Sequence, residues 1–103
     1  MTTIDGSSIH KLIVACDAGM GSSVMLASTL RKQLKKSGVT VEHSPVNEIP
    51  ADADVIVTHA GLAERARGVA PGVPVVPFQL FLGDPAVNEL VKAITSGGTI
   101  NVG

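Results

Sequence analysis

The residue of this chain best suited to chemistry is Cys16, its only cysteine. It ends a hydrophobic run over residues 12–15, which is typical of a buried strand, and it begins a turn that contains Gly19 and Gly21. In a strand–loop–helix of this kind, successive backbone N–H groups and the helix N-terminus converge and form a site for an anion. Such a site stabilises a thiolate, and it also holds an anion covalently attached to the sulfur.

The residues after Cys16 are predicted to supply this anion site. Leu26, Leu30 and Leu34 recur every four residues and predict a helix, for which Ser22 and Ser23 are suitable N-cap residues. We therefore expect Cys16 to be the catalytic residue. The residues expected to bind the anion are Asp17, Ala18, Gly19, Met20, Gly21, Ser22 and Ser23.

The residues around Cys16 are compatible with three interpretations of its role. A buried structural cysteine is common, but that role does not require a following loop of small residues with two serines. A phosphatase of the Cys-x5-Arg kind needs an arginine at the position that Ser22 occupies, and the first arginine in the chain is Arg31. A cysteine that accepts a phosphoryl group and passes it on needs mainly positioning and charge stabilisation, which backbone donors and hydroxyls supply.

Composition limits the other classes of function. The chain has 103 residues, which suits one domain over residues 1–103, with 45% hydrophobic residues and a net charge of −1. Two aromatic residues and scattered basic residues, apart from Arg31-Lys32 and Lys35-Lys36, argue against a nucleic-acid partner. We interpret that basic cluster as the solvated face of a helix.

Targeting and metal signals are weak in this sequence. One cysteine cannot form an internal disulfide, and no His, Cys, Asp and Glu cluster has metal-ligand spacing, so we expect no metal and no cofactor. Residues 1–10 lack the apolar stretch of a signal peptide, and no apolar run is long enough to cross a membrane. We expect a cytoplasmic protein without direct membrane insertion.

Strands alternate with helices along the chain, which predicts an α/β single-domain three-layer sandwich with helices on both faces of a parallel sheet. The strands are expected over residues 11–15, with Cys16 directly after the first one, and over 39–43, 54–59 and 73–76. The helices are expected from the turn to Ser37, over 62–67, and from Asp84-Pro85 to Gly97-Gly98, with a loop over 44–54 and loose termini at 1–10 and 98–103.

The expected sheet order is 2-1-3-4, with the strand that precedes Cys16 next to the strand that ends at Thr58-His59. Parallel sheets bind ligands beyond the carboxyl ends of the strands where the winding direction reverses, so these residues are expected at one site after a P-loop-like turn. Thr58 and His59 are candidates for supporting the bound group from behind the residues that touch it, although His59 also suits a hydrogen bond to nearby backbone. His10 and His43 are interpreted as ordinary surface residues.

An apolar stretch follows the fourth expected strand and contains Phe78, Leu80, Phe81 and Leu82. Core packing beneath the last helix is the simpler interpretation. Alternatively, part of this stretch and Met20 form an exposed rim for docking partners beside Cys16.

The run Ile-Val-Ala-Cys-Asp-Ala-Gly-Met-Gly-Ser-Ser over residues 13–23 resembles the active loop of the IIB domain of the bacterial phosphoenolpyruvate-dependent sugar phosphotransferase system, closest to the mannitol-specific type. The resemblance extends through Arg31-Lys32 and residues 54–66, and covers residues 11–93 approximately. It implies a four-stranded parallel fold and a phosphotransferase in which Cys16 takes a phosphoryl group from a phosphohistidine on a IIA protein. Cys16 then delivers the group to a sugar or polyol bound by the membrane-embedded IIC component, at the inner face of the membrane.

The chain departs from this resemblance at one place. Ala60 and Gly61 follow His59 where similar family members often carry a charged pair, so a cation that could stabilise the phosphocysteine is missing there. A regulatory module phosphorylated on the same cysteine has identical loop chemistry and stays open as an alternative to the carrier.

Overall fold

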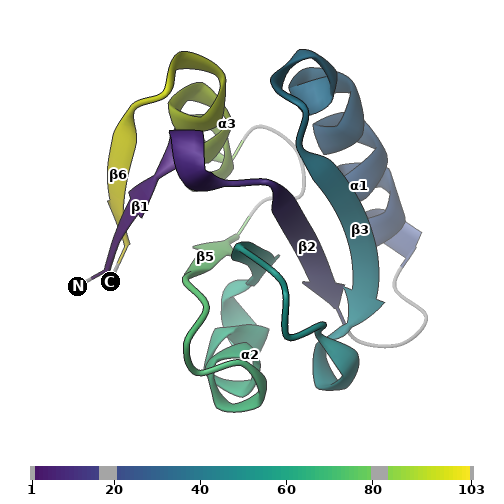
Figure 1. The fold of residues 1–103 in the computed structure, drawn as a ribbon. Helices are drawn as coiled ribbons and strands as arrows, with labels where there is room; N and C mark the ends of the chain where they lie inside the picture. The colour runs from purple at the N-terminus through teal and green to yellow at the C-terminus, as the bar shows by residue number, and fades with distance from the viewer. Residues whose placement is uncertain (1, 17–20, 80–83, 103) are drawn as a thin grey trace.

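Four parallel strands form the central sheet, in the order β3-β2-β4-β5 (Figure 1). The computed structural model describes residues 2–16, 21–79 and 84–102. The strands are β2 (Lys11–Cys16), β3 (Thr40–Pro45), β4 (Val55–His59) and β5 (Val75–Phe78). The predicted α/β class with a four-stranded parallel sheet is confirmed, and the order of the strands is the expected one.

Among the described residues, three α-helices cover the two faces of this sheet. They are α1 (Gly21–Leu34), α2 (Ala63–Val69) and α3 (Pro85–Ser96). Alternate residues of β2 point to opposite faces: Leu12 and Val14 pack in the cluster that includes residues of α1 and α3, whereas Ile13 and Ala15 pack in the cluster that includes residues of α2. Because both faces are covered, β2 and β4 read as continuous hydrophobic runs rather than as alternating ones.

Local signals in the sequence set most of the helix boundaries. The Asp84 carboxylate accepts a hydrogen bond from the Ala86 amide at 2.8 Å and caps α3, with Pro85 as its first residue. Gly38 and Gly97 both have a φ of 73°, the left-handed conformation that ends a helix and favours glycine. Gly38 follows η2 (Lys35–Ser37), a short 3-10 helix that continues α1.

The start of α1 differs from the prediction. The helix begins at Gly21, so Ser22 and Ser23 lie in its first turn and neither is its N-cap residue. The amides of the first turn have no acceptor within the helix, which leaves backbone donors at this end whichever residue precedes the helix.

The two termini are not loose, contrary to the prediction for residues 1–10 and 98–103. β1 (Thr2–Asp5) and β6 (Thr99–Val102) pair antiparallel as a separate two-stranded sheet (Figure 1). Ile4 is 2% exposed in the core, and η1 (Gly6–Ser8) follows it, with the Gly6 amide donating to the Gly98 carbonyl at 2.8 Å. The burial of Ile4, the packing of partly buried Ile100 against the same core and the strand pairing hold the ends in place.

The strand β3 ends later than the sequence predicts. It continues to Pro45, and η3 (Val46–Glu48) follows it directly, where a loop is expected. Proline lacks a donor and is tolerated on an edge strand, and β3 is at an edge of the sheet. The extension matters for the site, since it places Pro45 beside Cys16 in the parallel register.

Candidate functional site

Cys16 is the last residue of β2, a strand with neighbours on both sides in the sheet. Its thiol is free and only 2% of the residue's surface is exposed. The cysteine therefore ends one of the two central strands. Four residues separate it from α1, so it also lies shortly before the unpaired amides at the start of a helix. This is the location that parallel α/β sheets use for binding.

The side chain of His43 contacts the sulfur of Cys16. Its Nε2 lies 2.9 Å from Cys16 Sγ, across 27 positions of sequence, and the residue is only partly exposed. The interpretation of His43 as an ordinary surface residue is therefore wrong. The pairing of β3 with β2 identifies it: His43 stands opposite Val14 in the register, two residues before Cys16, and it shares a face with buried Val41.

Thr58 is fully buried in β4, and its hydroxyl donates to the Ala15 carbonyl at 2.9 Å. It therefore acts on the backbone of β2 immediately before Cys16. The parallel register also pairs Thr58 with Ala15, which brings the carboxyl ends of β2 and β4 together as expected.

His59 ends β4 and caps η4 (Ala60–Leu62), where its Nδ1 accepts a hydrogen bond from the Gly61 amide at 3.1 Å. Its ring meets Phe78 edge-on, with centroids 5.9 Å apart. The bond to nearby backbone agrees with the simpler of the two roles expected for His59. Phe78 is 1% exposed and packs in the core, whereas Leu80, Phe81, Leu82 and Met20 lie outside the described residues.

The expected anion-binding loop is described only at its C-terminal end. Asp17, Ala18, Gly19 and Met20 lie outside the described residues, and Gly21, Ser22 and Ser23 form the start of α1, with their side chains outside the description. The role of this loop therefore stays a prediction.

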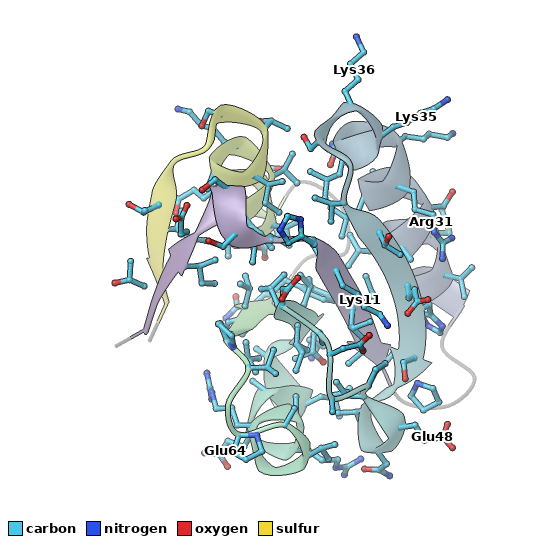
Figure 2. All side chains as sticks on the ribbon, viewed as in Figure 1. Lys11, Arg31, Lys35, Lys36, Glu48 and Glu64 are labelled. Atoms are coloured by element: carbon cyan, nitrogen blue, oxygen red, sulfur yellow. The ribbon has the colours of Figure 1, made fainter. Side chains whose placement is uncertain are left out.

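Basic side chains of α1 and η2 do not gather at the carboxyl end of β2. Figure 2 shows Lys35 and Lys36 at the opposite end of the molecule from Glu48 of η3, which directly follows β3. Arg31 is used structurally, because its Nε donates to the Val41 carbonyl at 2.9 Å and joins α1 to β3. This placement fits the interpretation of the basic cluster as a solvated helix face with one anchoring residue.

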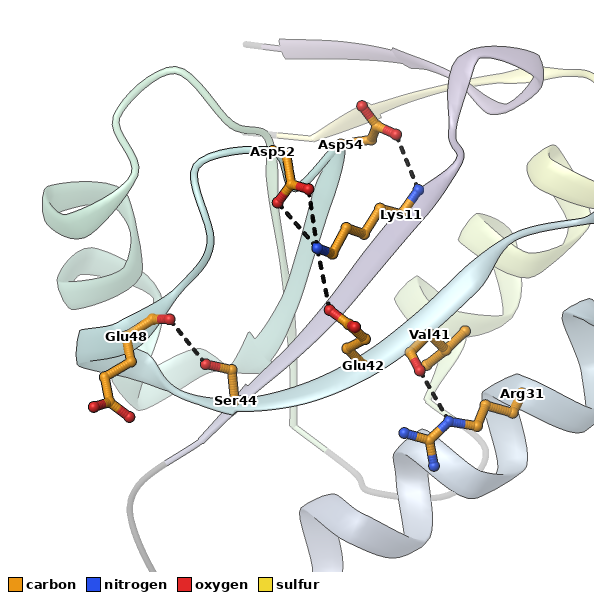
Figure 3. A network of polar contacts seen from close by, with 8 residues as sticks. All are labelled: Lys11, Arg31, Val41, Glu42, Ser44, Glu48, Asp52 and Asp54. Atoms are coloured by element: carbon orange, nitrogen blue, oxygen red, sulfur yellow. Dashed lines mark hydrogen bonds and ion pairs between the residues drawn. The ribbon is translucent and has the colours of Figure 1, made fainter.

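A polar network holds the other end of β2 (Figure 3). The ammonium of Lys11 lies 3.0 Å from Asp52 and 3.2 Å from Glu42. The hydrogen bond to Asp52, with a smaller contribution from Glu42, raises the pKa of Lys11, and the same bond lowers the pKa of Asp52. Asp54 accepts from the Lys11 amide at 2.9 Å, so β2 is fixed where it begins.

In the part of the chain that the structure describes, no helix is long and apolar enough to span a bilayer.

Comparison with known proteins supports the resemblance seen in the sequence. The family described as "PTS system, Lactose/Cellobiose specific IIB subunit" matches residues 11–93. The mannitol-specific EIICB component of Halalkalibacterium halodurans is 42% identical over 90 residues, which are 85% of this chain and 19% of that protein. The mannitol-specific EIICBA component of Vibrio cholerae is 44% identical over 93 residues, which are 88% of this chain and 14% of that protein.

A solved structure agrees at the level of the fold. The lactose-specific IIB component of Streptococcus pneumoniae matches with a TM-score of 0.50 and 17% sequence identity, and the match covers 86% of this chain and 94% of that one. The chain spans less than a fifth of the length of these two curated relatives. Since the family match extends over most of its residues, the chain belongs to the IIB family of the sugar phosphotransferase system.

Proposed function

We propose that this chain is a phosphoryl carrier whose acceptor is Cys16. The observation that supports this most is the position of the only cysteine, at the end of the central strand β2 and shortly before the amides of α1. The donor is the phosphohistidine of a IIA protein, and the receiver is a polyol bound by a membrane-embedded IIC component. The carrier works in the cytoplasm, at the inner face of the membrane.

The chemistry of the transfer fits a site of this kind. The sulfur attacks phosphorus, an S–P bond forms, and the N–P bond of the donor breaks with its electron pair staying on the donor ring. Little covalent chemistry is left for the protein, so catalysis rests on positioning and on stabilising the charge of the phosphoryl oxygens. Backbone donors of residues 17–23, including the first turn of α1, would supply that stabilisation.

Thr58 and His59 would support this site indirectly. The hydroxyl of Thr58 holds the carbonyl of Ala15, so it fixes the backbone that carries the sulfur. His59 shapes the turn after β4 through its bond to Gly61, where Ala60 and Gly61 offer no charged side chain to the phosphoryl group.

The burial of Cys16 adds one requirement. Since 2% of its surface is exposed, the sulfur must become accessible when the donor binds. We expect slow alkylation of the free protein by iodoacetamide, and faster alkylation when an unphosphorylated IIA partner is present.

Mannitol is the substrate that the comparisons favour. The relatives at about 40% identity are named mannitol-specific, whereas the lactose-specific IIB structure shares 17% of residues with this chain. We therefore expect phosphoryl delivery to mannitol through a mannitol-type IIC.

The test combines phosphoenolpyruvate, the general phosphotransfer proteins, a panel of IIA proteins, this chain and membranes that contain a mannitol-type IIC lacking its own IIB domain. Labelled mannitol phosphate should form with the wild-type chain and should not form with Cys16→Ser, because an alkoxide is harder to make and a poorer leaving group. Product formation with Cys16→Ser, or no product with any IIA and IIC pair, would contradict the carrier function.

A further inference from the structure

His43 lies directly against the reactive sulfur. The 2.9 Å between its Nε2 and Cys16 Sγ is within hydrogen-bonding distance, and a thiol and an imidazole can share a single proton along this contact. The resemblance to known IIB domains assigns no role to His43. The residue also lies outside the motifs on which that resemblance rests.

The register between β2 and β3 explains why these two side chains meet. His43 is paired with Val14, and Cys16 with Pro45, so all four residues present the same face of the sheet. That face is covered by α1 and α3, and Val14 belongs to the core beneath them. The imidazole therefore lies next to the sulfur on the face of the sheet that α1 and α3 cover.

The strand β3 is anchored on both sides of His43 (Figure 3). Before it, the Val41 carbonyl accepts from Arg31 and the Glu42 carboxylate meets Lys11 at 3.2 Å. After it, the Ser44 hydroxyl donates to the Glu48 carbonyl at 3.1 Å. An edge strand held at three neighbouring positions fixes the imidazole with less freedom than a loop residue would have.

We propose that His43 is the acid–base partner of Cys16, which keeps the sulfur as a thiolate and returns a proton at each transfer; this role rests on the carrier function proposed above. In the resting pair, the proton of the thiol resides on Nε2 and the imidazolium N–H donates to the thiolate, a charge-assisted hydrogen bond.

The proton count balances over both transfers. In the first, the thiolate forms the S–P bond, the N–P bond of the donor breaks, and the proton of His43 passes through water to the donor ring that has kept the electron pair. In the second, a polyol hydroxyl attacks phosphorus, the S–P bond breaks with its electrons going to sulfur, and the hydroxyl proton returns to His43. The imidazolium then stabilises the leaving thiolate.

A purely structural role predicts different behaviour. If the contact only packs β3 against β2, its removal lowers stability and leaves the ionisation of the sulfur unchanged. The composition makes the ionisation directly measurable, since the chain has one cysteine and no Trp or Tyr to obscure the ultraviolet band of a thiolate. This measurement does not require a reagent to reach the buried sulfur.

The experiment compares the thiolate absorbance at neutral pH of the wild type, His43→Ala and His43→Gln. Cys16→Ser serves as the blank. His10→Ala is the matched control, because His10 is exposed and lies just before β2, at the far end of that strand from Cys16. We expect the two His43 variants to show on the order of tenfold less thiolate than the wild type and His10→Ala. Circular dichroism checks folding, and the glutamine variant covers the case in which alanine unfolds the chain.

Phosphoryl acceptance from a IIA protein is measured on the same variants. We expect His43→Ala to accept at a rate lower by about 100-fold, the lower end for loss of a general acid–base group. Equal thiolate absorbance in folded wild type and His43 variants would overturn the proposal, and so would an unchanged transfer rate. If the wild type accepts no phosphoryl group although its thiolate signal depends on His43, then the carrier function fails and the Cys16–His43 proton pair stands.

Discussion

Gly6 is the position at which a single added methyl group tests how the N-terminal segment is attached. A Cβ built on Gly6 would overlap the backbone carbonyl of Ala93 and come within 2.7 Å of the Ile94 amide nitrogen in α3. Backbone atoms of a helix cannot rotate away as a flexible side chain could. We therefore expect Gly6→Ala to push η1 off α3.

The cost follows from what that displacement breaks. Ile4 is 2% exposed beside this contact, and the Gly6 amide donates to Gly98 at 2.8 Å. Overpacking of a well-packed interior costs roughly 1–3 kcal/mol, which exceeds the 0.4–1 kcal/mol or so that alanine contributes by restricting the unfolded chain. We expect a net loss of about 1–2 kcal/mol. For a domain of this size, such a loss lowers Tm by about 10 °C.

The assay is thermal unfolding followed by far-ultraviolet circular dichroism, with Gly68→Ala as the matched control. No atom lies within 4 Å of a Cβ at Gly68, in α2, so alanine there should raise stability by about 0.5 kcal/mol through helix propensity. If Gly6→Ala is as stable as the wild type, or is stabilised like the control, then the N-terminal segment does not pack on α3 and the reasoning is refuted.

Two further predictions concern polar contacts. Thr58→Val removes the buried hydroxyl that donates to the Ala15 carbonyl, which should cost about 1–3 kcal/mol in urea unfolding, and an unchanged midpoint would show that this bond does not stabilise the strand pair. Lys11 lowers the pKa of Asp52, so the contribution of this carboxylate to stability is present at neutral pH and is lost as the pH falls through the lowered pKa of the folded state. The stability difference between wild type and Asp52→Asn should accordingly shrink on acidification and at high salt, and a difference independent of pH would contradict the ion pair.

Much of the fold can be predicted because the sequence marks it locally. The hydrophobic runs of β2 and β4, the Asp84-Pro85 start of α3 and the glycines at 38 and 97 each have one preferred structural use. The paired termini carry no comparable signal. β1 and β6 are four residues each, they mix polar and apolar residues without a long hydrophobic run, and they pair from opposite ends of the chain.

The candidate site shows the same difference between local sequence signals and contacts between distant segments. Cys16 is found from its own neighbours, since a strand followed by a glycine-rich turn is a local pattern. His43 is found only through the pairing of β3 with β2, because its contact with the sulfur is made across 27 residues. Its alternation with buried Val41 is compatible with the site but does not by itself name a partner.

We propose that Cys16 carries the phosphoryl group, and one measurement tests this directly. The direct measurement is to incubate the chain with a phosphorylated IIA protein and to locate the added group by mass spectrometry of the intact protein and of its peptides, under conditions that preserve S–P bonds. We predict the mass of one phosphoryl group, carried by the peptide that contains Cys16, released by iodine, and missing in Cys16→Ser. A phosphoryl group on His43, His59 or a serine, or an unmodified Cys16 with every donor, would contradict the account.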